Sequence, residues 1–321
     1  MQRHGAWIDV LPFNGRETII RDSNTRVELE NELKDYCETL WAPKKKEGWA
    51  SSWVAYANRI SFLADAVEIR AGAMPFHLVD GSVKSIEEEK PFAPKQSYVP
   101  CLSVGFPTAT KDGKVIFQRR PENVHVPNTL IHEPCGYMSS KNFAPGKICD
   151  DERYAGDSRL FNLETQLNFR RREIANTFGL LPEQVSYEMT QDFIGLGWKS
   201  LEMYFSTIGK INANESELKT PEKGEFFFVP FENLKQLIYN QGKLSKVNPD
   251  GYRPANAEDI PMIDESLMGL IYGYERMTGE KLDVNETVER LNFDGMNIKI
   301  HDTSPGRVYA PHQGVKVYSK L

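Results

Sequence analysis

The stretch from Ser158 to Leu180 constrains the fold of this chain more than any other segment. Its apolar residues have helical spacing from about Leu160 to Phe178, which predicts one long helix. Asp157 or Ser158 can cap the first amides of this helix. Gly179 stands where a helix commonly ends in the left-handed conformation. We therefore expect a helix whose two ends are fixed by the sequence.

The residues within this helix follow a known spacing. Glu164 is followed after seven residues by Arg172-Glu173-Ile174, then after one residue by Asn176-Thr177, and after one more by Gly179-Leu180. The pattern resembles the Nudix box, which reads Gly, five residues, Glu, seven residues, Arg-Glu-aliphatic, one residue, Glu-Glu, one residue, Gly-aliphatic. Six positions match in register, and Ser158, Asn176 and Thr177 depart from the pattern.

The segments around the helix resemble the same family. Asp112-Gly113 lies between two apolar runs and predicts a tight hairpin before the box. Pro134-Cys135-Gly136 is similar to the Pro-Gly-Gly segment of the family, here separated from the helix by an insertion. Residues 225–238, "EFFFVPFENLKQLI", resemble the family's strand that leads through a proline into a helix. The resemblance extends from Tyr98 to Gln241.

The resemblance implies an α/β (α+β) fold of the Nudix type, an α/β/α sandwich with a mixed sheet. We expect three segments: an N-terminal α+β extension at 1–95, a Nudix-like domain at 96–241, and a C-terminal helical segment with a mixed tail at 242–321. Outside the Nudix-like segment, periodicity predicts helices at 26–41, 49–70 and 262–292, a charged loop at 42–48, and short extended pieces with turns at 67–81.

Residues three and four apart share one face of a helix, so Glu173, Asn176 and Thr177 project together. The resemblance implies that this face carries three carboxylates in an active member, which hold Mg²⁺ or Mn²⁺ against a substrate diphosphate. Asn and Thr offer neutral oxygens that do not offset a divalent charge. Catalytic roles would therefore fall to Glu173, Glu164 and Arg172, with Arg172 expected to pair with Glu164.

Metal binding could also use carboxylates from elsewhere in the chain. Glu225 is the first candidate, so that Glu173 and Glu225 would form the metal site and Glu225 would add a catalytic carboxylate. Further candidates are Glu188, Asp192, Glu202 and the acids of the insertion, Asp150, Asp151 and Glu152.

Candidate ligand-binding residues surround the same helix. Arg119 and Arg120 end the hairpin strand, where they could meet a phosphate, and Gly136, Asn176 and Thr177 would line the same cleft. His125 and His132 are expected to be packing or surface residues. Phe193 and Trp198 could stack on a base, although core or rim packing is the more common role of such residues.

Three functions remain open. The first is a Nudix-like protein with weakened or lost hydrolase activity, which binds a nucleotide or a related diphosphate as a sensor or regulator. The second is an active Nudix diphosphate hydrolase with relocated metal ligands, dependent on Mg²⁺ or Mn²⁺. The third is an assembly module that binds protein or RNA, with a protein partner on the terminal extensions.

Composition narrows the setting of these functions. The chain has 321 residues, of which 40% are hydrophobic and 26% charged, and this is ordinary for a globular protein. A net charge of −6 does not favour a nucleic-acid partner. Four scattered cysteines and no long apolar run favour a cytoplasmic protein without a membrane span.

Overall fold

The computed structural model describes residues 7–48, 51–90, 99–120, 129–132, 134–140, 157–188, 192–197, 200–219, 225–243, 262–311 and 316–319. Its fold mixes α and β structure, as the sequence predicts. The helices of the described part are α1 (Asn31–Lys46), α2 (Phe76–Glu87), α3 (Leu163–Thr177), α4 (Phe231–Tyr239), α5 (Asp264–Thr278) and α6 (Val284–Phe293). Short 3-10 helices are η3 (Ser158–Phe161), η4 (Pro182–Gln184) and η5 (Glu215–Glu217).

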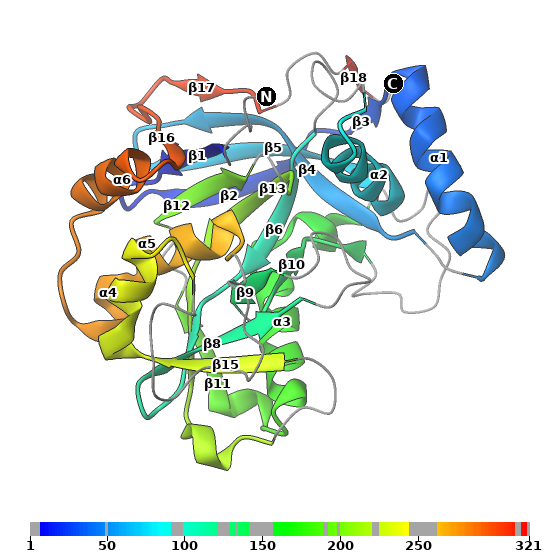
Figure 1. Ribbon diagram of the computed structural model, residues 1–321. Helices are drawn as coiled ribbons and strands as arrows, with labels where there is room; N and C mark the ends of the chain where they lie inside the picture. The colour runs from blue at the N-terminus through cyan, green and yellow to red at the C-terminus, as the bar shows by residue number, and fades with distance from the viewer. Residues whose placement is uncertain are drawn as a thin grey trace.

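The strands of the described part form three sheets (Figure 1). The ten-stranded sheet contains β1 (Trp7–Pro12), β2 (Glu17–Asp22), β4 (Trp53–Phe62), β5 (Ala66–Pro75), β6 (Cys101–Gly105), β10 (Cys135–Tyr137), β12 (Phe193–Gly197), β13 (Glu202–Ser206), β16 (Asn297–Ile300) and β17 (Val308–Tyr309). The six-stranded sheet contains β7 (Thr108–Ala109), β8 (Lys114–Arg119), β9 (Leu130–His132), β11 (Val185–Glu188), β14 (Ile208–Ile211) and β15 (Glu225–Pro230). The remaining pair is β3 (Thr25–Glu28) with β18 (Lys316–Ser319).

The main path of the ten-stranded sheet runs β16-β1-β12-β13-β6-β4-β5-β2, so neighbours come from distant parts of the sequence. β1 pairs with both β12 and β16. The sheet thus takes strands from all three segments expected from the sequence. The expected boundary near residue 95 falls outside the described residues.

The structure corrects several expectations for the N-terminal part. Residues 49–70 contain no helix where they are described; instead β4 and β5 form a long antiparallel pair. The pairing is favoured because seven of the ten residues of β4 are buried, and its aromatic and β-branched residues pack well in a sheet. The helix expected at 26–41 begins only at Asn31 and continues through the predicted loop to Lys46. Of the short extended pieces expected at 67–81, residues 67–75 lie in strand β5 as expected, whereas residues 76–81 belong to helix α2.

The segment at 96–241 agrees more closely with the sequence. The hairpin between β7 and β8 is confirmed, and Gly113 has a φ of 76° in its turn. The passage from β15 to α4 at Pro230 is confirmed as well. The helix expected at 262–292 is divided by Gly279, whose φ of 76° ends α5 before α6 begins.

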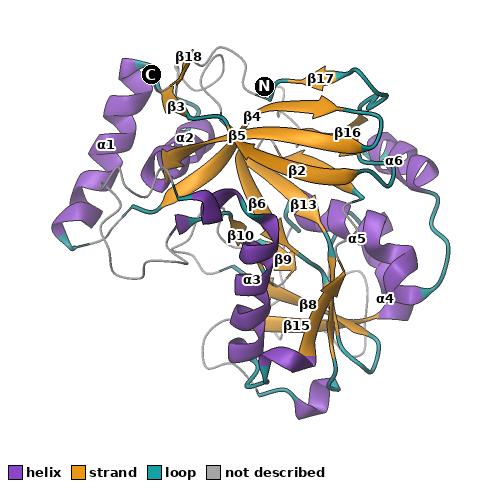
Figure 2. Cartoon of the chain, turned by 180° about the vertical axis from the view of Figure 1, so that it is seen from behind, coloured by secondary structure: helices purple, strands orange, loops and turns teal. Residues whose placement is uncertain are grey.

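Helices cover both sheets (Figure 2). The first half of α3 contributes Leu163 and Leu167 to a core with the ten-stranded sheet. The second half contributes Ile174 and Phe178 to a core with the six-stranded sheet. On the other side, α4, α5 and α6 share a core with both sheets. Helix α3 therefore spans the junction of the two sheets.

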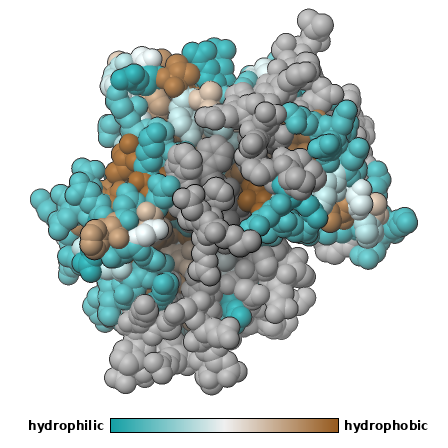
Figure 3. Space-filling view, turned by 45° about the horizontal axis from the view of Figure 1, so that its top comes forward, coloured by the Kyte–Doolittle hydropathy of each residue, from teal (hydrophilic) through white to brown (hydrophobic). Residues whose placement is uncertain are grey.

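Hydrophilic side chains cover much of the coloured surface in Figure 3, with smaller hydrophobic areas between them. In the described part of the chain, no helix is both long and apolar enough to cross a membrane.

Candidate functional site

Helix α3 begins and ends at defined residues. Asp157 caps η3 by accepting a hydrogen bond from the amide of Arg159. Asn162, which the sequence analysis did not single out, caps α3 by accepting from the amide of Thr165 at 2.8 Å. At the other end Gly179 has a φ of 68°, and the amide of Leu180 bonds back to the carbonyl of Ala175 at 2.8 Å. The predicted glycine stop is confirmed.

Glu173, the one carboxylate on the predicted metal face, forms an ion pair within its own helix. Its Oε2 is 2.7 Å from Nη1 of Arg170, one turn earlier. The guanidinium of Arg170 is almost fully buried and also donates from Nη2 to the carbonyl oxygen of Tyr137 at 3.1 Å. It lies so close to Gly136 that a Cβ at this position would collide with it. Arg170, which also pairs with Glu173, therefore connects α3 to β10 through its hydrogen bond to Tyr137.

The other two positions of this face carry no charge. Asn176 is exposed, and the hydroxyl of Thr177 donates to the carbonyl oxygen of Glu173 at 2.9 Å. This bond within the helix uses the only hydrogen that Thr177 can donate.

The ion pair expected between Arg172 and Glu164 is not formed in the structure. Both side chains are exposed, and neither forms an ion pair with any described residue. Both lie in α3 and are eight residues apart, a rise of about 12 Å along the axis. The arginine that packs between α3 and the sheet is Arg170, which the spacing of the motif does not mark.

Glu225 lies on the other face of the six-stranded sheet. It is opposite Arg119 across the β8–β15 pair, and Oε2 of Glu225 is 3.4 Å from Nη1 of Arg119. Phe226, the next residue, packs edge to face on Phe178 of α3. Successive residues of a strand point to opposite faces, so the sheet separates Glu225 and Arg119 from α3.

Gly136 lies in β10, and Arg120 lies near this strand. The amide of Arg120 bonds to the carbonyl oxygen of Thr129 at 2.9 Å. Burial raises the pKa of the Tyr137 hydroxyl, the charge of Glu202 adds to this shift, and the charge of Arg120 opposes it. Arg120 is therefore close to the hydroxyl of Tyr137, whose side chain points to the opposite face of β10 from the side on which Gly136 meets Arg170.

The other candidate carboxylates are engaged or lie elsewhere. Glu188 and Asp192 both accept from Arg276, at 3.0 and 2.9 Å. Glu202 is buried on the α5 side of the ten-stranded sheet, away from α3. Asp150, Asp151 and Glu152 lie outside the described residues, as do His125, Trp198 and Cys149. Cys37, Cys101 and Cys135 form no disulfide.

His132 and Phe193 are buried, and contacts within the protein account for both. The ring of Phe193 stacks on Tyr272 with centroids 4.2 Å apart. Nε2 of His132 is 2.8 Å from the hydroxyl of Tyr204, which itself donates to the carbonyl oxygen of Gly105. The single hydroxyl hydrogen is thereby used, so His132 carries its proton on Nε2 and donates it to Tyr204. Burial lowers the pKa of His132 to about 3, which keeps it neutral.

One feature of this side of the sheet was not foreseen from the sequence. Glu202 in β13 and Glu265 in α5 are both buried, each with 2% exposure. Among the described residues, Oε2 of each carboxylate has no hydrogen-bond partner. The sequence offers no local signal for this pair, because the two residues lie on separate elements far apart in the chain.

The α3 face can offer one neutralised carboxylate, an amide and a hydroxyl, with arginines at its edge. Among the described residues, no group of three or more His, Cys, Asp or Glu side chains is placed to hold a metal ion. The residues that the structure brings together are Arg170, Glu173 and Gly136, with Arg120 close to β10. Arg119 and Glu225 form a separate pair.

Comparisons with known proteins add little to this picture. No protein-family model matches the chain, and no curated protein sequence matches it. A matching solved structure is the Nudix hydrolase RenU from M. smegmatis, at 16% identity and a TM-score of 0.28. The match covers 57% of this chain and 88% of that one. A TM-score this low carries no conclusion about activity.

Proposed function

We propose that this chain is a Nudix-like protein that binds a nucleotide or a related diphosphate-linked ligand without hydrolysing it, as a sensor or regulator. The ion pair between Arg170 and Glu173 carries this proposal. A carboxylate that already has a guanidinium 2.7 Å away offers little net charge to a divalent cation. The two neighbouring positions, Asn176 and Thr177, add no charge. The chemistry that needs a metal ion on this face is therefore disfavoured.

The arginines near β10 support the binding of an anionic group. Guanidinium groups present a planar set of donors that matches phosphate oxygens. Arg120 lies beside β10, and Asn176 presents an exposed amide from α3. The proposal gives Arg120 the contact with phosphate and gives Asn176, on α3, no part in that contact. Arg119, already 3.4 Å from Glu225, has the weaker claim.

The competing function is a hydrolase whose metal ligands lie elsewhere. Glu225, Glu188 and Asp192 are each within ion-pair distance of an arginine, so each would have to exchange that partner for the metal. Glu202 is separated from α3 by the sheet. These contacts favour binding over hydrolysis.

A ligand panel with two readouts tests the proposal. The wild-type chain is mixed with nucleoside triphosphates, dinucleotides and sugar nucleotides, with Mg²⁺ or Mn²⁺ and without metal. Melting temperature reports binding, because a ligand that prefers the native state raises it. Chromatography of the same mixtures reports product.

The expected result is a higher melting temperature with at least one diphosphate-containing ligand and no product. This shift should shrink in Arg120→Gln and persist in Arg59→Gln, an exposed arginine of β4 that serves as the matched control. Release of product with metal would overturn the proposal in favour of the hydrolase. No shift with any ligand would overturn it in favour of an assembly role through the terminal extensions.

A further inference from the structure

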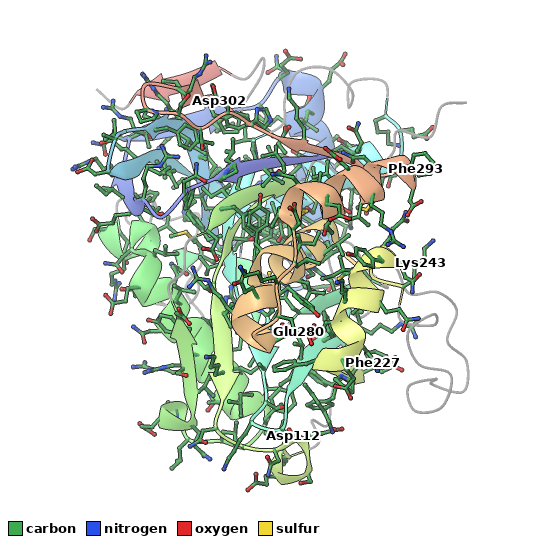
Figure 4. The ribbon with its side chains drawn as sticks, turned by 90° about the vertical axis from the view of Figure 1, so that its left-hand side faces the viewer. Asp112, Phe227, Lys243, Glu280, Phe293 and Asp302 are labelled. Atoms are coloured by element: carbon green, nitrogen blue, oxygen red, sulfur yellow. The ribbon has the colours of Figure 1, made fainter. Side chains whose placement is uncertain are left out.

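A buried polar surface lies between α5 and the ten-stranded sheet. β13 and β6 pair in parallel, which places Glu202 beside Cys101 and Tyr204 beside Ser103. β6 and β10 pair antiparallel, which places Ser103 beside Tyr137. Paired residues point to the same side of a sheet, so these five side chains share one face. Helix α5 packs against this face (Figure 4), where Glu280 lies two residues beyond the end of the helix.

Glu265 enters this surface from the first turn of α5. Its Oε1 accepts a hydrogen bond from the hydroxyl of Ser200. It also lies where a Cβ on Gly197 would be, so a side chain at Gly197 would collide with the carboxylate. Because Gly197 of β12 has no side chain, the carboxylate of Glu265 fits against the sheet at this position.

Glu202 is directly beside this position. It pairs with Gly197 across β12 and β13, and the Cβ positions of paired residues lie about 5 Å apart. The amide of Glu202 also donates to Oγ of Ser200 at 3.4 Å, the same atom that bonds to Glu265. The two carboxyl groups are thus neighbours, linked through one serine.

The described groups around the pair supply no neutralising contact. Burial raises the pKa of Glu265 first, and the charges of Glu202 and then Asp264 raise it further. Cys101, Tyr137 and Tyr204 also face the pair, and burial raises the pKa of each, so all three stay neutral near pH 7.

Two basic side chains lie nearby. His132 is neutral, because burial lowers its pKa to about 3. The charge of Arg120 lowers the pKa of the Tyr137 hydroxyl, although burial raises this pKa overall, and the guanidinium forms no ion pair with either glutamate among the described residues. Two adjacent buried carboxylates with no counterion among the described residues are strongly disfavoured, and the simplest remedy is that one of them keeps its proton.

We propose that Glu265 keeps its proton at neutral pH beside the buried carboxylate of Glu202, so that the two residues form a proton-dependent latch that holds the start of α5 against the ten-stranded sheet. The proton supplies a donor for one of the two Oε2 atoms that have no partner in the described part of the chain, and it leaves a single negative charge on the pair. When the pair loses this proton, two adjacent charges repel each other, and the contact between α5 and β13 weakens.

The sign of the pH dependence follows from the raised pKa. Glutamate in an unfolded chain has a pKa of about 4.3. Between that value and the higher value of the folded pair, the folded chain binds more protons than the unfolded chain. Stability is therefore fully present below the unfolded value and is lost as pH rises through the folded value.

Urea denaturation of the full chain between pH 7 and pH 9 tests the latch. Neutral His132 is largely uncharged in both states over this range, so it adds little slope. The variants are Glu265→Gln and Glu202→Gln, with Glu289→Gln, an exposed glutamate of α6, as the matched control. While the folded pair keeps its proton, the unfolding equilibrium constant of the wild type and the control should rise by up to about tenfold per pH unit relative to Glu265→Gln. In Glu202→Gln this rise should end at a lower pH, because the burial of Glu265 remains and the charge of Glu202 is gone. Parallel pH curves for all four proteins would overturn the proposal.

Infrared spectroscopy of the wild type at pH 7 gives a second readout that does not require the variants to fold. The C=O stretch of a protonated carboxylic acid should be present and should disappear as pH rises. A spectrum without this band would overturn the proposal. The proposal would also be overturned if Mn²⁺ or Ca²⁺ stabilised the wild type but not Glu265→Gln and a chelator reversed this effect, because a metal ion would then hold the two carboxylates together.

Discussion

Replacing Arg170 or Arg172 by methionine separates the structural account from the motif. Arg170 is buried and makes two charge-assisted contacts, whereas Arg172 is exposed and has no ion pair among the described residues. Methionine keeps most of the apolar stem in both cases and removes only the guanidinium.

The magnitudes follow from the contacts that are lost. The hydrogen bond from Arg170 to Tyr137 has a charged donor and contributes about 1.5 to 3 kcal/mol. The pair with Glu173, which is 44% exposed, adds about 0.2 to 1 kcal/mol. Arg170→Met should therefore lower the free energy of unfolding by about 2 to 4 kcal/mol. Arg172→Met should change it by no more than about 0.5 kcal/mol.

Urea denaturation followed by circular dichroism measures both values on the full chain. Arg172→Met is the matched control, since it makes the same chemical change two residues away on the same helix. A loss at Arg172 equal to or greater than that at Arg170 would refute the placement of Arg170 between α3 and β10.

Three further predictions concern stability. His132 has a pKa of about 3 in the folded chain and about 6.5 in the unfolded chain, so the free energy of unfolding should decrease by up to about 5 kcal/mol as the pH is lowered from 6.5 to 3. Urea denaturation from pH 7 down to pH 4 should show a smaller decrease in His132→Gln than in the wild type. An equal decrease in both would contradict the buried neutral state. Gly136→Ala should cost about 1 to 3 kcal/mol through collision with Arg170, and the loss should shrink in an Arg170→Met background; equal losses in both backgrounds would exclude the collision. Asn162→Ala should cost about 1 kcal/mol in a thermal melt through loss of the N-cap, and no change would show that the cap is not formed.

The parts of the fold that the sequence predicted well are those with local signals. Asp112-Gly113, the glycine stop at Gly179 and the passage at Pro230 each depend on the conformational preferences of one or two residues. The error at 49–70 has the opposite origin. β4 and β5 are stabilised by cross-strand pairing and burial, which the local sequence does not report.

The candidate site was predicted only in part, for a similar reason. Spacing placed Glu173, Asn176 and Thr177 on one face, and the structure describes all three in one helix. Spacing did not identify Arg170 as the buried arginine, because its partners on β10 are separated from it by the insertion. Nor did it pair Glu202 with Glu265, whose proximity follows from the position of Gly197 in another strand.

Binding of Mn²⁺ to the wild-type chain tests the central claim most directly. Electron paramagnetic resonance, which detects free Mn²⁺, should find no saturable Mn²⁺ site in the wild type that is lost in Glu173→Gln, because Arg170 already neutralises this carboxylate. The double variant Asn176→Glu with Thr177→Glu should gain such a site, since it restores two charges to the same face of α3. One Mn²⁺ bound by the wild type and lost in Glu173→Gln would contradict the account.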